Sequence, residues 1–193
     1  MRLHKDEIKD MLLASAALIF IFSYPEFLSQ PSLLFASAMA IASGFVLHEL
    51  AHRFVANKFG VTARFAMWKE GLAIALILAI ATNGSFVFAA PGAVMINSVR
   101  FSLRGLVALG KKEYGIISAA GPVTNLFLAA AFALLHSSTA DNLFLYAAHV
   151  NVSLALFNMI PIPPLDGSKV ISWSLAVWAV IIAAIALFRI FLA

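Results

Sequence analysis

The hydrophobic positions of the chain form long apolar runs separated by short polar or charged segments. The first run extends from about Met11 to Tyr24, and a longer one extends from about Ser32 to Lys58. A membrane-spanning helix needs roughly 20 apolar residues, so the second run is long enough and the first is marginal. We predict a transmembrane helix in each. Gly60 follows the second run, where a glycine typically ends a helix.

The pattern changes between residues 61 and 99. Val61–Trp68 alternates apolar and polar residues in its first half, which favours an edge strand or an interfacial segment. Two apolar runs follow, separated by the turn signal Asn83-Gly84, and Pro91-Gly92 would break any continuous helix. We predict a hairpin or re-entrant pair here. Backbone of this kind is tolerated at membrane depth where it lines a cavity enclosed by protein.

The second half of the chain again consists of apolar helices. One is predicted from near Glu113 to about His136, and the next from about Asn142 to Met159. Three prolines within residues 161–164 cannot continue a helix, so the chain unwinds before a last helix from Ser168 to about Leu192. The pattern therefore predicts an all-α polytopic membrane protein with about six transmembrane helices and a re-entrant or β-like segment in the middle.

Composition agrees with a membrane protein. Of the 193 residues, 63% are hydrophobic and 11% are charged, whereas roughly a quarter are charged in soluble domains. No internal repeat or linker is visible, so we expect one transmembrane domain over residues 1–193. The chain has no cysteine, so any metal must be held by His, Asp or Glu.

The basic residues lie in clusters between the apolar runs, which fits lipid headgroups better than nucleic acid, and we expect no nucleic-acid partner. One cluster precedes the first helix, a second follows the second helix, and a third follows residue 99. Since basic loops stay in the cytoplasm, we predict a multi-pass protein of the cell membrane with a cytoplasmic N-terminus. The clusters contain Arg2, Lys5, Lys9, Arg53, Lys58, Arg64, Lys69, Arg100, Arg104, Lys111 and Lys112.

Inside the second apolar run lies an H-E-x-x-H motif, His48-Glu49-Leu50-Ala51-His52. Histidines four residues apart lie on one face of a helix, where both rings can bind the same Zn²⁺. Glu49 beside them can take a proton from a zinc-bound water and deliver it to a leaving amine. Such a spacing also arises by accident, but unpaired ionisable groups at membrane depth are costly. We therefore interpret the motif as a metal site nearer the cytoplasmic face.

A hydrolytic zinc site needs a third protein ligand. By helix counting, Asp166 lies at a depth similar to that of the two histidines, directly after the proline-broken segment. It could instead be the N-cap of the last helix, but we predict it as the third ligand. Most other carboxylates fall at membrane boundaries or in loops, where solvation accounts for them. They are Glu7, Asp10, Glu26, Glu70, Glu113 and Asp141.

Three motifs together resemble the site-2 proteases, which are intramembrane zinc metalloproteases. They are H-E-L-A-H at residues 48–52, G-P-x-x-N at Gly121–Asn125, and N-x-x-P-x-P-P-L-D-G at Asn158–Gly167. They occur in the family's order, and the third is much more specific than the first. The chain departs from many members by D-G-S in place of D-G-G and by a longer insertion over residues 71–96, and we expect no appended PDZ-like or CBS-type domain.

The resemblance implies the roles of the motif residues. His48, His52 and Asp166 would bind one zinc ion per chain, and Glu49 would be the catalytic base. Asn158 would help to hold the substrate backbone near the metal. The implied activity is hydrolysis of peptide bonds in the transmembrane segment of a membrane-protein substrate, within the lipid bilayer, by a zinc-bound water that Glu49 activates.

Two hypotheses concern substrate binding. A helical substrate must unwind locally or present an extended segment, and a strand within residues 61–96 could pair with that segment by β-addition. Asn125 is a further candidate for a hydrogen bond to the substrate backbone, although an interhelical contact explains it equally well.

The main alternative function is a divalent-metal transporter or channel that uses the same ligands. Such proteins often have repeated halves and several acidic residues along a path, and the sequence has neither. A catalytically inactive relative is a third interpretation, against which the intact Glu49 argues.

Overall fold

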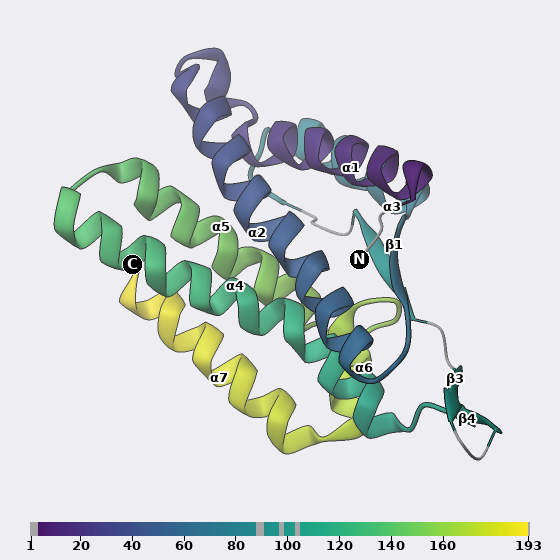
Figure 1. The fold of residues 1–193 in the computed structure, drawn as a ribbon. Coiled ribbons are helices and arrows are strands. Elements are labelled where there is room, and N and C mark those ends of the chain that lie inside the picture. Colours follow the sequence, from purple (N-terminus) through teal and green to yellow (C-terminus); the bar gives the residue numbers. More distant parts are fainter. Residues whose placement is uncertain (1–3, 88–90, 97–98, 103–104, 193) are drawn as a thin grey trace.

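The computed structural model describes residues 4–87, 91–96, 99–102 and 105–192, and its main body is a set of packed helices (Figure 1). The helices are α1 (Lys5–Ser23), α2 (Ser32–Lys58), α3 (Lys69–Ala81), α4 (Lys111–Thr139), α5 (Asn142–Asn158), α6 (Asp166–Trp173) and α7 (Leu175–Phe191), with a 3-10 turn, η1 (Glu26–Leu28), after α1. The strands are β1 (Ala63–Met67), β2 (Gly92–Ile96), β3 (Val99–Ser102) and β4 (Gly105–Ala108). The protein is mostly helical, as the apolar runs predict.

Helix α2 has the bounds that the sequence predicts, Ser32–Lys58. Gly60 follows its end with a φ of +73°, a left-handed conformation that favours glycine, so its predicted role in ending the helix is confirmed. Among the described helices, α2 and α4 are long and apolar enough to cross a membrane, and α7 is a shorter apolar helix. The number of about six spans stays a prediction.

Small and aliphatic side chains join the helices. One core connects α1, α2 and α5 and includes Leu18, Ala40 and Leu154. A second connects α4, α5 and α7 and includes Ala129 and Ile185. Alanine at these contacts lets helix backbones approach closely, which strengthens van der Waals packing between apolar helices.

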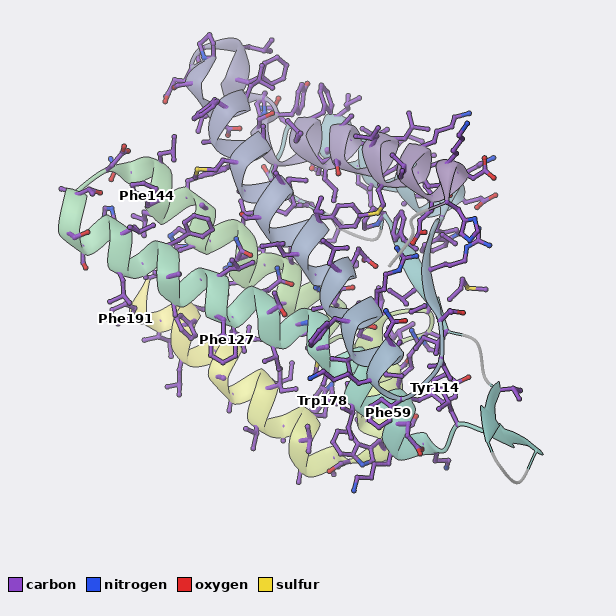
Figure 2. The ribbon with its side chains drawn as sticks, viewed as in Figure 1. Phe59, Tyr114, Phe127, Phe144, Trp178 and Phe191 are labelled. Atoms are coloured by element: carbon purple, nitrogen blue, oxygen red, sulfur yellow. The ribbon has the colours of Figure 1, made fainter. Side chains whose placement is uncertain are left out.

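The outer surface of the helices is also apolar. Phe127 of α4 is 73% exposed and Phe191 of α7 is 76% exposed, and both extend away from the packed interior (Figure 2). Large exposed apolar side chains occur on most of the other helices as well. So many exposed apolar side chains are unfavourable in water and well solvated by hydrocarbon, so they suit a membrane protein.

The segment between α2 and α4 contains the strands. β1 pairs with β2 in antiparallel register, with Phe65 opposite Val94, which confirms the edge-strand interpretation of residues 61–68. The break predicted at Pro91-Gly92 is the point where β2 begins. The hairpin of β3 and β4 has no counterpart in the predicted pattern. Arg2, Arg104 and residues 88–90 of the second apolar run lie outside the described residues.

Helix α4 extends two to three residues beyond its predicted ends, and two larger differences concern the first and last helices. Helix α1 begins at Lys5 and not near Met11. The prediction followed the apolar run, which starts at Met11, whereas the helix also contains the charged residues before it. The predicted last helix is divided into α6 and α7 at Ser174, whose backbone is extended. The Ser174 hydroxyl oxygen accepts the N–H of Val177 at 3.3 Å, so this residue starts a new helix.

Trp178 of α7 donates its indole N–H to the carbonyl oxygen of Met159 at 2.8 Å, at the end of α5. We predict that Trp178→Phe lowers the free energy of unfolding by about 1 kcal/mol, because it removes one partly buried hydrogen bond. Denaturant unfolding in detergent micelles measures this. Trp173→Phe is the matched control, since no hydrogen bond is described for its indole. Equal destabilisation by both substitutions would contradict the prediction.

Candidate metal centre

Two histidines and one aspartate meet where α2, α4 and α6 pack together. His48 and His52 extend from one face of α2, with their ring centroids 4.6 Å apart. Asp166 belongs to the first turn of α6, and its Oδ2 lies 3.3 Å from Nε2 of His48 and 3.0 Å from Nε2 of His52. The three residues are 3%, 1% and 6% exposed. Their candidate ligand atoms lie within 4.8 Å of one another, close enough to hold one metal ion.

Hydrogen bonds on the far side of each ring determine which nitrogen faces Asp166. Nδ1 of His48 lies 2.5 Å from Oδ1 of Asn125, and Nδ1 of His52 lies 2.7 Å from the carbonyl oxygen of Ile117. Both partners are acceptors, so in the neutral rings each Nδ1 donates its proton and each Nε2 keeps a free lone pair. Metal-binding histidines are usually oriented in this way.

The proline-rich turn brings Asp166 to the histidines. After α5 the chain passes residues 161–164 in turns and then starts α6. Gly167 packs so closely that a Cβ there would overlap the carbonyl oxygen of Met159. Leu165 takes the N-cap position of α6, so the N-cap alternative for Asp166 is wrong. Its carboxylate therefore faces the histidines from the first helical turn.

A glycine in α4 leaves room between the two rings. A Cβ at Gly121 would overlap the Nε2 atoms of both His48 and His52. Any larger residue at this position would fill the space that a bound ion needs. The G-P-x-x-N motif of α4 thus contributes to the site twice, through the absence of a side chain at Gly121 and through the amide of Asn125.

The donor set suits zinc. Two neutral imidazole nitrogens and one carboxylate oxygen form a typical three-residue set for catalytic zinc, whose fourth position takes water or substrate. Nε2 of His52 is buried and, in the part of the chain that the structure describes, makes no hydrogen bond. A buried polar atom without a partner is unfavourable, and a metal ion would provide that partner.

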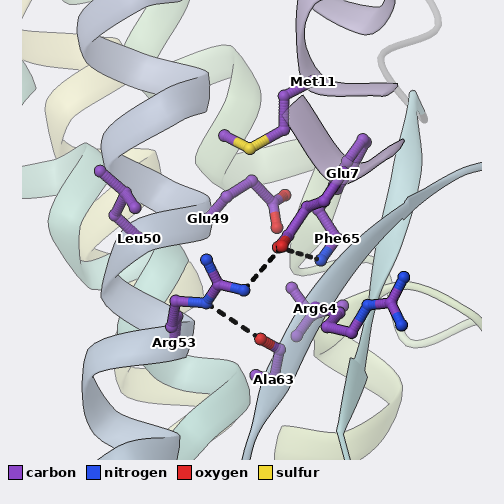
Figure 3. A pocket seen from close by; sticks show the side chains of 9 residues that line it. Glu7, Met11, Glu49, Leu50, Arg53, Ala63, Arg64 and Phe65 are labelled. Atoms are coloured by element: carbon purple, nitrogen blue, oxygen red, sulfur yellow. Dashed lines mark hydrogen bonds and ion pairs between the residues drawn. The ribbon is translucent and has the colours of Figure 1, made fainter. Parts of the chain in front are cut away.

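Glu49 lies beside this group and not in it. Its Oε2 is buried and has no hydrogen-bond partner among the described residues. Figure 3 shows the carboxylate pointing into a narrow cavity next to Glu7, with Arg53 below it. The cavity volume is about 10 Å³, enough for one water molecule. A carboxylate in such a place can exchange a proton with a water.

Comparison with known proteins identifies the family. The family model of peptidase family M50 matches residues 133–186. MJ0611 of Methanocaldococcus jannaschii, named as a candidate zinc metalloprotease, is 40% identical over 185 residues, which cover 93% of this chain and 91% of its own. The chain belongs to peptidase family M50. YwhC of Bacillus subtilis, named in the same way, is 32% identical over 148 residues, covering 66% of this chain and 63% of its own. No solved structure matches the M50 chain.

Membership of family M50 confirms three predictions. The protein is a zinc metalloprotease, its cofactor is zinc, and the resemblance to the site-2 proteases drawn from the three motifs holds. The group of His48, His52 and Asp166 is the place where the described structure can hold the metal ion.

The asparagines of the M50 chain have different surroundings. Asn125 is fully buried and donates its Nδ2 to the carbonyl oxygen of Gly44 and to Oδ1 of Asn151, at 3.0 Å each, besides its contact with His48. Sequence reasoning missed Asn151, since a single amide in an apolar helix carries no spacing signal. Asn158 is half-buried at the end of α5 and donates to a carbonyl of its own helix. The predicted substrate contacts of Asn125 and Asn158 stay predictions.

The solvated-charge interpretation of Glu7 is wrong. Glu7 is 3% exposed, and its Oε2 accepts a hydrogen bond from Nη2 of Arg53 at 2.7 Å. Arg53 is itself 7% exposed, so it is buried and paired with Glu7 and is not a solvated member of the basic cluster that follows the second apolar run. The available signal was the position of Arg53 directly after His52, where an unpaired guanidinium would be costly.

His48→Ala and Asp166→Ala should each strongly reduce the zinc content of purified, metal-replete M50 protein, which we expect to be about one ion per chain in the wild type. Each substitution removes one of three donors. Elemental analysis measures the content, and His149→Ala, which lies outside the described metal group, is the matched control. Full zinc content in Asp166→Ala would show that the third ligand is assigned wrongly.

Asn125→Ala should weaken zinc binding by about 10- to 100-fold, because His48 loses the acceptor that orients its ring. Competition with a chelating dye measures the affinity. Thr124→Ala is the neighbouring control, since the Thr124 hydroxyl donates to a carbonyl of its own helix. An unchanged zinc affinity in Asn125→Ala would show that contacts other than the one with Asn125 orient the His48 ring.

Proposed function

We propose that this M50 protease hydrolyses peptide bonds inside the transmembrane segments of membrane-protein substrates, as in regulated intramembrane proteolysis. The observation that carries the proposal is the buried convergence of Asp166 of α6 with His48 and His52 of α2, a helix long and apolar enough to cross a membrane. A hydrolytic site at that depth suits a substrate bond that also lies in the membrane.

In this proposal His48, His52 and Asp166 hold the zinc ion, which when bound supplies a Lewis acid that activates water and polarises a peptide carbonyl. Glu49 accepts the proton of the attacking water on its carboxylate and later donates it to the leaving amine. Asn125 keeps the His48 ring in place from α4. Asn158, close to the turn that carries Asp166, is the candidate for a hydrogen bond to the substrate backbone.

The substrate must be extended where it is cut, because carbonyls in a helix are engaged in hydrogen bonds. We propose that β1 receives such a segment by β-addition. Ala63, Arg64 and Phe65 of β1 line the cavity into which Glu49 points, so a peptide paired with this strand would pass beside the catalytic carboxylate.

The topology follows from the basic clusters. We propose a multi-pass protein of the cell membrane, with residues 1–193 as one catalytic domain, a cytoplasmic N-terminus and the metal centre nearer the cytoplasmic face. A divalent-metal transporter with the same ligands is not favoured, because both relatives are named as zinc metalloproteases.

Glu49→Gln tests the function. The substitution should keep the zinc content and lower cleavage by at least about 100-fold, because it removes the proton acceptor and keeps the shape. The assay uses liposomes that contain the protease and single-span test proteins, with a helix-weakening Asn-Pro pair in the apolar segment. Mass spectrometry of the fragments locates the cut.

Glu70→Gln is the matched control, since Glu70 is exposed in the first turn of α3. Cleavage by Glu49→Gln at the wild-type rate would contradict the role of Glu49. A wild-type enzyme that cuts soluble peptides and leaves every membrane-embedded test protein intact would contradict the intramembrane part of the proposal.

A further inference from the structure

One edge of β1 faces helices α1 and α2 instead of a strand. In an antiparallel pair, successive residues direct their N–H and C=O groups alternately to the two edges. The N–H of Trp68, next after β1, donates to the carbonyl oxygen of Pro91 on the β2 side. Ala63, Phe65 and Met67 therefore direct their backbone groups the other way, and we call these three residues the outer edge of β1.

Two carboxylates of α1 accept hydrogen bonds from backbone N–H groups of the outer edge. Oε1 of Glu7 accepts the N–H of Phe65 at 3.1 Å, and Oδ2 of Asp10 accepts the N–H of Met67 at 3.3 Å. Glu7 and Asp10 lie three residues apart on one helix face, and Phe65 and Met67 are successive donors on one strand edge. The two side-chain oxygens stand where carbonyl oxygens of a paired strand would stand. We call Glu7 and Asp10 the edge cap.

Arg53 connects the edge cap to the catalytic helix. Its Nη2 donates to Oε2 of Glu7 at 2.7 Å, and its Nε donates to the carbonyl oxygen of Ala63 at 3.1 Å (Figure 3). Both charged side chains are at least nine-tenths buried. Arg53 follows His52 directly in α2. Its ion pair with Glu7 therefore connects the helix of the H-E-x-x-H motif to α1, and its hydrogen bond to Ala63 connects that helix to β1.

The edge cap leaves no space for a peptide. A strand added to β1 would lie about 4.8 Å from it, where the two carboxylates now stand. The cavity between the outer edge and Glu49 has a volume of only about 10 Å³. The described structure is therefore closed to an extended substrate at this edge.

We propose that the edge cap is an autoinhibitory contact: Glu7 and Asp10 occupy the substrate-binding edge of β1, and an extended substrate must displace them before it reaches Glu49. The proposal rests on the proposed function, because it assumes that the substrate pairs with β1. The incoming peptide would satisfy the N–H groups of Phe65 and Met67 with its own carbonyl oxygens.

A cross-link between α1 and β1 is the first test. The chain has no cysteine, so Asp10→Cys/Met67→Cys can be joined by a short, reductively cleavable bis-thiol reagent in otherwise unchanged protein. We expect the joined protein to lose more than nine-tenths of its cleavage of the Asn-Pro test protein and to recover it when the linker is reduced. The same double variant without the reagent is the control.

Release of the edge cap is the second test. Glu7→Gln/Asp10→Asn should lower the apparent KM for the test protein about fivefold, because the apparent affinity of a fractionally open site rises with the open fraction. Glu26→Gln/Asp141→Asn removes two charges from exposed residues outside the edge cap and is the matched control, since Asn can also serve as the N-cap that Asp141 provides for α5. If the edge-cap variant does not fold, the cross-linking result stands on its own.

The outcomes separate the two proposals. Full cleavage by the joined protein, or an apparent KM that rises in Glu7→Gln/Asp10→Asn, would overturn the autoinhibitory contact, and the first result would place the substrate elsewhere, such as on β2. Neither result would touch the proposed hydrolysis of peptide bonds in membrane-embedded segments as long as the wild type cleaves the test protein and Glu49→Gln does not, although the first result would remove the proposed pairing of the substrate with β1. Failure of that pair of observations would instead overturn the proposed function.

Discussion

An imidazole ring buried among apolar helices needs a partner for each of its nitrogens, and this requirement organises the centre of the protein. The two rings of α2 obtain their first partners from α4, through the amide of Asn125 and the carbonyl of Ile117. Their second nitrogens then converge on Asp166. In neutral rings the Nε2 atoms of His48 and His52 carry lone pairs and no proton, so they cannot form hydrogen bonds with the Asp166 carboxylate that they face. A metal ion would complete the arrangement by binding all three groups.

The surrounding backbone is shaped by that convergence. Gly121 must lack a side chain for the rings to have open space between them, and Gly167 must lack one for α6 to start against Met159. The prolines between α5 and α6 prevent the helix from carrying Asp166 past the histidines. These glycines and prolines contribute little apolar burial, and their role is to position the Asp166 carboxylate. The apolar helices around them provide the stability that such a turn lacks.

The metal group could be predicted from the sequence, whereas the contacts that surround it could not. His48, Glu49 and His52 lie within one local spacing rule, and Asp166 is a rare carboxylate next to a proline-broken helix. The pair of Glu7 and Arg53 is separated by 46 positions, and no periodicity relates residues so distant. Hydropathy also misplaces the start of α1, because it assigns charged residues to water. The β3–β4 hairpin lies in a segment whose basic residues are as compatible with a loop as with strands.

The edge cap and the apolar core use different parts of α1. Leu18 and Ile21 are fully buried near its C-terminal end, whereas the hydrogen bonds to β1 involve its first two turns. Displacing the edge cap separates Glu7 from Arg53, and this buried ion pair is favourable only while the two side chains remain together. A competing strand can replace the backbone bonds but not the ion pair, so the opening has a cost that each substrate must offset with its own contacts. In the proposed intramembrane function the enzyme meets many apolar segments, and this cost favours those that extend easily. In this way a buried ion pair next to the catalytic helix contributes to substrate selection without contacting the bond that is cut.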